Sequence, residues 1–252
     1  MKLWLLRHAA VIGGMSFLGA CSGSGSSATP PPSQATVQLR FAEGAPALEA
    51  IIDGVPQDIG AAFLQVDGQT VSSSFDYGSF TQFASFGVGT HSLSALDDLG
   101  YRVGPLKIPP LTAGKQYTLV LVGSYPNYQV LRFEEPAVTG GAQEALYEAS
   151  PSQTQADFGR FTASSHSHFV KLGNAAFGEI ATVALGSHVG NFGGYAGEGT
   201  KPFKNGTFAP SQIDSFDKTN ALPFHNVSRL SLFVFDAQQS STPVSVFASL
   251  DR

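Results

Sequence analysis

The chain has 252 residues, of which 42% are hydrophobic and only 13% are charged, and its formal net charge is −5. It contains no run of lysine or arginine, so it lacks the cations with which nucleic-acid-binding proteins neutralise phosphates. Its single cysteine, Cys21, excludes an internal disulfide and a zinc site built from several thiolates. We therefore expect no nucleic-acid partner, and we expect a domain that folds without internal disulfide bonds.

The first 20 residues have the features of an export signal. Lys2 and Arg7 accompany an apolar segment that is too short to span a membrane. The following Leu18-Gly19-Ala20-Cys21 is similar to the lipobox of bacterial lipoproteins, in which a peptidase cuts before the cysteine and the thiol carries a diacylglyceryl group. The resemblance implies cleavage between Ala20 and Cys21, lipidation of Cys21 and attachment to a membrane through this lipid. An ordinary cleaved signal peptide with a chance cysteine is the alternative.

Residues 21–35 are predicted to be a linker between this signal and the folded part of the chain. The segment from Ser22 to Ser33 reads SGSGSSATPPPS, in which glycine and serine provide flexibility and three prolines provide stiffness. In many Gram-negative bacteria an aspartate after the cysteine retains lipoproteins in the inner membrane, and this chain has Ser22 there. The resemblance therefore implies a lipid-anchored protein of the bacterial cell envelope, with the outer membrane or cell surface favoured.

The remainder of the chain shows the signals of short β-strands joined by tight turns. Glycine (28 residues), proline (15) and phenylalanine (20) are abundant, which suits strands and turns better than helices. Apolar and polar residues alternate from Thr36 to Ala42, as in a half-buried strand. The run from Tyr117 to Val122 is apolar almost throughout and is typical of a strand that is covered on both faces. These patterns predict an all-β fold.

Three stretches resemble the DUF4397 family. They are LRFAEGAPAL (39–48) followed by Asp53-Gly54, GVGTHSL (87–93) and LTAGKQYTLV (111–120). The stretches occur in the family's order, and the resemblance covers about residues 36–136. It implies a β-sandwich in a bacterial envelope or secreted protein. The family has no established catalytic residues, so the resemblance supplies no active site.

The second half of the chain is predicted to repeat the first in degenerate form. Residues 137–154 are interpreted as an interdomain segment with a short helix near 142–149, and residues 155–252 as the second copy. Residues 158–163 resemble 38–43, residues 230–236 resemble 117–123, and residues 244–250 resemble 128–133. We therefore expect two tandem immunoglobulin-like β-sandwich domains, at 36–136 and 155–252. One larger sandwich is the alternative.

Few residues are candidates for chemistry. His166 and His168 would share one face of a strand, which makes them weak candidates for a shared metal ion, and a polar loop is the alternative. Ser215 and Lys218 match the S-x-x-K spacing of penicillin-interacting enzymes, but the S-D-N and K-T-G elements of those enzymes are missing. We therefore predict no catalytic residue, no resident metal and no cofactor.

Aromatic side chains are the remaining candidates for a functional role. Those between Phe75 and Phe86 are expected to pack mostly in the core, whereas Tyr125 and Tyr128 flank a predicted hairpin tip and are candidates for contact with a ligand. The leading hypothesis is a non-catalytic, membrane-anchored envelope lipoprotein that binds an envelope protein or a glycan. The alternatives are a structural surface spacer without a specific ligand and, less favoured, a histidine-based metalloprotein.

Overall fold

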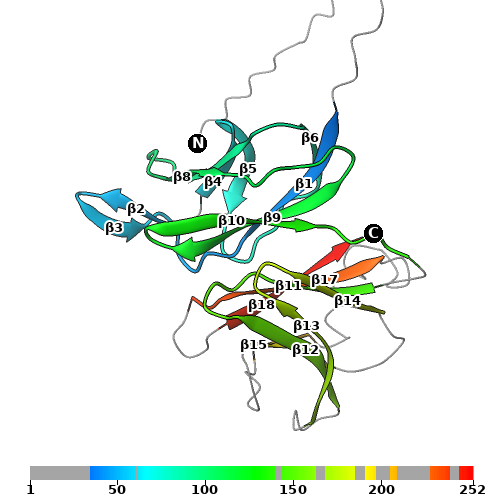
Figure 1. Ribbon diagram of the computed structural model, residues 1–252. Coiled ribbons are helices and arrows are strands. Elements are labelled where there is room, and N and C mark those ends of the chain that lie inside the picture. Colours follow the sequence, from blue (N-terminus) through cyan, green and yellow to red (C-terminus); the bar gives the residue numbers. More distant parts are fainter. Residues whose placement is uncertain are drawn as a thin grey trace, which may run out of the picture. The chain divides into compact units, whose positions relative to one another are not determined.

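The computed structural model describes residues 35–60, 62–139, 143–162, 168–184, 191–196, 205–208, 228–238 and 244–251. These residues form strands and turns, which confirms the prediction of an all-β fold (Figure 1). Nothing in the described ranges forms a helix that is long and apolar enough to cross a membrane. The contacts group Gln34–Arg252 into one compact unit. The predicted signal, Ala20, Cys21, the linker up to residue 34 and His166 lie outside the described residues.

Ten strands make up the first half of this unit. They are β1 (Thr36–Glu43), β2 (Glu49–Ile52), β3 (Val55–Asp58), β4 (Ala62–Val66), β5 (Gln69–Phe75), β6 (Ala84–Gly87), β7 (Ser92–Leu96), β8 (Arg102–Lys107), β9 (Gln116–Ser124) and β10 (Asn127–Glu134). The order β10-β9-β1-β6 forms sheet 1, and the order β5-β4-β7-β8 forms sheet 2. The hairpin β2–β3 stands apart from both sheets (Figure 1).

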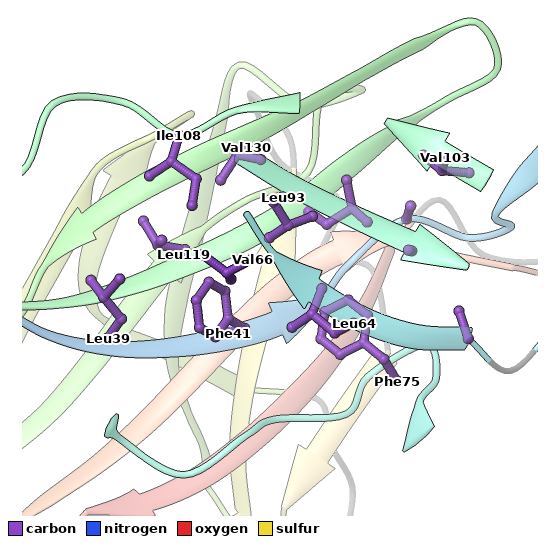
Figure 2. Packing of buried hydrophobic residues seen from close by; sticks show 14 of the residues in the cluster. Leu39, Phe41, Leu64, Val66, Phe75, Leu93, Val103, Ile108, Leu119 and Val130 are labelled. Carbon is purple, nitrogen blue, oxygen red and sulfur yellow. The ribbon is translucent and has the colours of Figure 1, made fainter. Parts of the chain in front are cut away.

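Sheets 1 and 2 pack against each other as a sandwich with a continuous apolar core. Leu39 and Phe41 on β1 and Leu119 on β9 belong to the same buried cluster as Leu64 and Leu93 from sheet 2 (Figure 2). The predicted alternation in β1 supplies this core, because alternate residues of a strand point to one face. Burial of such side chains stabilises a sandwich by roughly 25 cal/mol for each Å² of apolar surface removed from water.

Eight further described strands make up the second half. They are β11 (Gln143–Glu148), β12 (Gln155–Thr162), β13 (His168–Ala176), β14 (Ile180–Ala184), β15 (Asn191–Ala196), β16 (Asn205–Phe208), β17 (Arg229–Asp236) and β18 (Val244–Asp251). The order β14-β11-β17-β18 forms sheet 3, and the order β13-β12-β15-β16 forms sheet 4. A second apolar cluster joins these sheets, with Leu146, Leu232 and Val234 from sheet 3 and Ala156 and Ala175 from sheet 4.

The second half repeats the strand order of the first. Strands β1 and β4–β10 of the first half correspond, in chain order, to β11–β18 of the second half. With this correspondence, the strand order of sheet 1 becomes that of sheet 3, and the strand order of sheet 2 becomes that of sheet 4. The directions also agree, because β1 runs parallel to β9 and antiparallel to β6, as β11 runs parallel to β17 and antiparallel to β14. Only the hairpin β2–β3 has no counterpart among the described strands. The two halves therefore share one topology, and the immunoglobulin-like assignment stays a prediction.

One pair of acidic residues shows how closely the two copies correspond. Glu43 ends β1 and Glu148 ends β11, and each carboxylate accepts a hydrogen bond from the backbone N–H two residues later, at Ala45 (2.7 Å) and Ser150 (2.8 Å). Burial raises the pKa of Glu148 to about 8 and raises the pKa of Glu43 well above its usual value. Both side chains therefore favour the neutral carboxylic acid, which is less costly to bury than a carboxylate.

The start of the second copy was predicted wrongly. Strand β11 lies inside residues 137–154, which were interpreted as an interdomain segment with a helix near 142–149. Glutamine, glutamate, alanine and leucine favour helix in isolation, but β11 is held between β14 and β17, and this tertiary pairing overrides the local preference. The equivalence of residues 158–163 with 38–43 is also wrong, because β12 corresponds to β4. The register of β17 and β18 agrees with the other two equivalences.

Sheets 1 and 3 face each other across a third apolar cluster. Val120 and Phe133 from sheet 1 pack there with Tyr147, Phe233 and Phe235 from sheet 3. The rings of Tyr147 and Phe233 are stacked, with centroids 4.1 Å apart. Strands β9 and β17 are therefore covered on both faces, which confirms the reading of the apolar run at 117–122.

A histidine–aspartate pair ties two turns of the first half together. His91 Nδ1 lies 2.6 Å from Asp67 Oδ2, and His91 Nε2 lies 2.8 Å from the carbonyl oxygen of Gly87. Both partners accept hydrogen bonds, so the doubly protonated ring fits best, and the hydrogen bond to Asp67 raises the pKa of His91.

We expect this pair to make stability depend on pH. The stabilisation of the folded state that accompanies the raised pKa of His91 is fully present below about pH 6.5, the usual pKa of histidine. This stabilisation is lost as the pH rises through the pKa of His91 in the folded state. An NMR titration of His91 should give a pKa above the usual value. His91→Gln should remove the corresponding step from the pH dependence of Tm. An unchanged pH dependence in His91→Gln would contradict the assignment.

Candidate binding site

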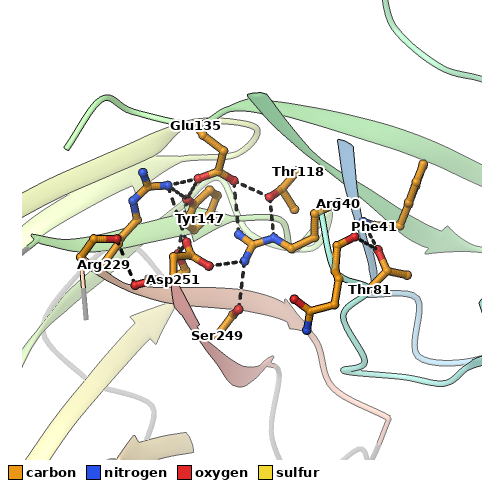
Figure 3. A network of polar contacts seen from close by, with 12 residues as sticks. Arg40, Phe41, Thr81, Thr118, Glu135, Tyr147, Arg229, Ser249 and Asp251 are labelled. Carbon is orange, nitrogen blue, oxygen red and sulfur yellow. Dashed lines mark hydrogen bonds and ion pairs between the residues drawn. The ribbon is translucent and has the colours of Figure 1, made fainter. Parts of the chain in front are cut away.

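A network of buried charges closes one end of the contact between sheets 1 and 3. We call it the junction network, and Figure 3 shows how its side chains converge from both halves. Its members come from β1, β9, β11, β17 and β18 and from the residue that follows β10, and are Arg40, Thr118, Glu135, Tyr147, Arg229, Ser231, Ser249 and Asp251. Two arginines and two carboxylates give it a formal charge of zero, which is what a buried cluster requires.

Arg40 is the centre of the junction network. Its Nη1 atom donates to Asp251 Oδ1 at 2.6 Å and to Ser249 Oγ at 2.9 Å, its Nε donates to Thr118 Oγ1 at 3.0 Å, and its Nη2 lies 3.3 Å from Glu135 Oε1. Only 2% of the Arg40 residue is exposed. Its position in β1 predicted a solvent-facing side chain, but sheet 3 covers that face of the strand.

Arg229 completes the network from the second half. Its guanidinium contacts Glu135 and donates to the carbonyl oxygen of Pro136 at 2.7 Å, and it lies 3.7 Å from Asp251. The hydroxyl of Tyr147 donates to Glu135 at 2.6 Å, and burial raises the pKa of Tyr147, so this phenol stays protonated. The carboxylate of Glu135 therefore accepts from four side chains, those of Arg40, Thr118, Tyr147 and Arg229.

The two carboxylates of the network occupy equivalent places in the two copies. Gln116 of β9 corresponds to Arg229 of β17, and these residues lie beside Glu135 and Asp251 respectively. Each carboxylate accepts from the hydroxyl of the neighbouring strand, Glu135 from Thr118 and Asp251 from Ser231. The repeat thus places two like charges face to face, and the two arginines compensate them.

A cavity of about 1160 Å³ opens above the junction network. We call it the junction cavity. Its lining residues come from the network, the 80–83 segment, the start of β9 and the segment after β10, and are Arg40, Phe80, Thr81, Gln82, Phe83, Gly114, Lys115, Gln116, Glu134, Glu135, Pro136, Ala137, Val138, Ser228, Arg229, Ser249 and Asp251. Lys115 and Glu134 form an exposed ion pair of 2.7 Å at its edge.

Phe83 is the unusual aromatic residue of this cavity. Its ring centroid lies 4.6 Å from the guanidinium carbon of Arg40, a cation–π arrangement. The neighbouring Phe75 and Phe80 pack with apolar clusters, as expected of this aromatic stretch, but none of the clusters found among the described residues includes Phe83. Phe83 is half-buried at the cavity wall. Its ring is therefore available to a ligand at little cost to the core.

The predicted binding residues lie elsewhere. Tyr125 is 37% exposed at the turn between β9 and β10. Tyr128 is half-buried, and its hydroxyl donates to the carbonyl of Ala47 at 3.0 Å and accepts from the N–H of Glu49 at 2.7 Å. Tyr128 therefore anchors the hairpin β2–β3 and is committed to the fold. Neither residue lines the junction cavity.

The histidine hypothesis gains no geometric support. His168 begins β13, where it pairs with Thr162. Within the described ranges of the chain, no three histidine, cysteine, aspartate or glutamate residues lie close enough together to hold a metal ion. His91 is paired with Asp67 on the first half and is far in sequence from His168.

No known protein family and no curated protein matches this chain. The assignment to the DUF4397 family and to the bacterial lipoproteins therefore stays a prediction.

Sequence reasoning missed the junction network and its cavity. Arg40 stands within the stretch that was used for the family resemblance, but its period-2 position indicated exposure. Glu135 directly follows Glu134 in the sequence, and nothing in this acidic pair shows that the side chain of Glu134 is exposed while that of Glu135 is buried. The sequence contained one signal of this network. The chain has few charged residues, and several of them stand at the ends of its most apolar strands.

Proposed function

We propose that this chain is a lipid-anchored protein of the bacterial cell envelope whose folded part is a non-catalytic binding module. The observation that carries the binding role is the junction cavity, because it is a large concave site whose lining combines polar groups with an accessible aromatic ring. The anchor rests on the resemblance of Leu18-Gly19-Ala20-Cys21 to a lipobox. The linker that follows would let the folded unit stand away from the membrane.

The chemistry of the cavity supports binding over catalysis. Its described lining contains no histidine and no cysteine. Glu134, Glu135 and Asp251 are each held in an ion pair with lysine or arginine, so none of these carboxylates is free to act on a substrate. The cavity is built from groups that hold one another in place, which suits recognition of a ligand.

The anchor leads to a direct prediction. Cells that express the wild-type chain and are labelled with radioactive palmitate should give a labelled band, and Cys21→Ala should abolish the label because the lipidated thiol is gone. Ser22→Ala keeps the cysteine and serves as the matched control. Labelling of Cys21→Ala at the wild-type level would refute the lipobox assignment.

The binding role is tested by cross-linking in intact cells. The chain carries a C-terminal tag, the cells are treated with a cross-linker, and the material that co-purifies is identified as protein or carbohydrate. A dominant partner of either kind supports a binding module. Recovery of nothing above the untagged control would contradict it and would favour a structural surface spacer.

A further inference from the structure

We propose that the junction cavity binds an uncharged, polyhydroxylated glycan. This inference rests on the proposed function, since it names the class of ligand for the same cavity. Four features of the cavity support it: the charge of the lining, its hydrogen-bonding groups, the ring of Phe83 and the volume.

The charges of the lining disfavour an ionic ligand. Arg40, Lys115 and Arg229 face Glu134, Glu135 and Asp251, so the described lining has three charges of each sign. Each of these groups already has an oppositely charged partner, at distances such as 2.6 Å for Arg40–Asp251 and 2.7 Å for Lys115–Glu134. A charged ligand that reaches the junction network would have to displace one of its buried pairs, such as Arg40–Asp251, and leave a buried charge without compensation, which is costly.

The polar groups of the lining also disfavour an apolar ligand. Gln82 and Gln116 contribute amides, and Thr81, Ser228 and Ser249 contribute hydroxyls, beside the six charged groups. Covering them with hydrocarbon would remove their hydrogen bonds to water without replacement. A sugar hydroxyl both donates and accepts, so a row of such groups satisfies arginine donors, carboxylate acceptors and amides at once.

Phe83 supplies the apolar part of the recognition. Its ring lies against Arg40 on one side and belongs to none of the core clusters among the described residues. A half-buried aromatic ring whose orientation is held by a cation offers a flat platform for the C–H face of a sugar ring. The junction network fixes this platform, because Arg40 is itself held by Thr118, Ser249 and Asp251.

The volume points to an oligosaccharide. Pockets for small molecules usually measure about 300–1,000 Å³. The junction cavity, at about 1160 Å³, exceeds this range and is lined from both halves of the chain. Several linked sugar units fit such a space better than a single one.

The test uses the full-length chain with a C-terminal tag and a panel of uncharged polysaccharides, including dextran, soluble glucan and galactomannan. Affinity electrophoresis should show retardation by at least one of them. Phe83→Ala should weaken this binding by about tenfold and Gln116→Ala by about fivefold. The matched controls are Phe63→Ala and Gln129→Ala, which change exposed residues outside the cavity and should bind as the wild type does.

Three results would overturn the proposal. The first is the absence of retardation across the whole panel. The second is binding that disappears when the salt is raised to about 1 M, because such binding is ionic. Loss of binding in the controls equal to that in Phe83→Ala and Gln116→Ala would also overturn it, since the cavity would then not be the site.

A photo-cross-linking amino acid at Gln82 separates this proposal from the proposed function. A carbohydrate adduct in intact cells supports both. A protein adduct alone overturns the glycan but supports the binding module. No adduct overturns both.

Discussion

Replacing Arg40 by alanine is expected to lower the free energy of unfolding by about 3–5 kcal/mol. The substitution leaves Asp251 without its 2.6 Å partner and removes one of the two cations beside Glu135. Both carboxylates are largely buried, with side chains 15% and 2% exposed, so water does not replace the lost contact. The cost comes mainly from the charge left uncompensated in the junction network.

Urea unfolding of the full chain measures this effect. Arg102→Ala removes an exposed arginine of β8 and should change the free energy of unfolding by less than about 0.5 kcal/mol. The double variant Arg40→Met/Asp251→Leu should lose much less than the sum of its single substitutions, because it removes both signs of charge together. Equal losses in Arg40→Ala and Arg102→Ala would show that the junction network does not stabilise the fold.

Gly78→Ala is expected to destabilise the protein by about 1–3 kcal/mol more than Gly178→Ala. The two glycines are equivalent in the two copies, since the N–H of Gly78 donates to the carbonyl of Glu43 and that of Gly178 donates to the carbonyl of Glu148. Their φ angles are +80° and +82°, so a side chain costs the same backbone strain at both positions. Only Gly78 meets an obstacle, because a Cβ there would lie 2.1 Å from the ring of Phe247.

The comparison isolates the contact between the two halves. No atom lies within 4 Å of a Cβ placed at Gly178, so Gly178→Ala reports the strain alone. The ring of Phe247 also packs edge-on against Tyr77, with centroids 5.0 Å apart, and a shift of Phe247 would disturb this contact. Thermal unfolding of both variants gives the difference. Equal losses of Tm would mean that the first half does not pack on Phe247 in solution.

These two predictions concern opposite sides of one interface. The junction network closes one end of the contact between sheets 1 and 3, and Tyr77, Phe235 and Phe247 pack at the other. Gly44, like Gly78, allows the two halves to approach closely at that end, since a Cβ on it would come within 2.7 Å of Phe235. Interactions at both ends hold the two halves in one arrangement, and this arrangement gives the junction cavity its walls.

Local sequence patterns were sufficient for the strands whose burial follows a simple period. The alternation at 36–42 placed Val37, Leu39 and Phe41 in the core, and the continuous run at 117–122 predicted a strand covered on both faces. The likeness of residues 230–236 to 117–123 also agrees with the strand register. Whether a side chain in a strand is buried depends on the face to which it points, so a period along the chain is enough to predict its burial.

The same patterns failed where a residue's role depends on a distant partner. Strand β11 has helix-favouring residues and becomes a strand only between β14 and β17. Tyr128 resembled an exposed aromatic, but its hydroxyl is bound at the hairpin β2–β3.

The all-β class, the strands at 36–42 and 117–122 and the expectation of a lipid anchor at Cys21 follow from the order of the residues, because each depends on neighbours along the chain. The burial of Arg40, the placement of Glu135 opposite Asp251 and the cavity above them arise from tertiary packing. Arg40 meets Thr118 and Asp251 across 78 and 211 residues of sequence. Charges so far apart carry no shared local pattern, and they come together only because the two copies of the sandwich pack face to face.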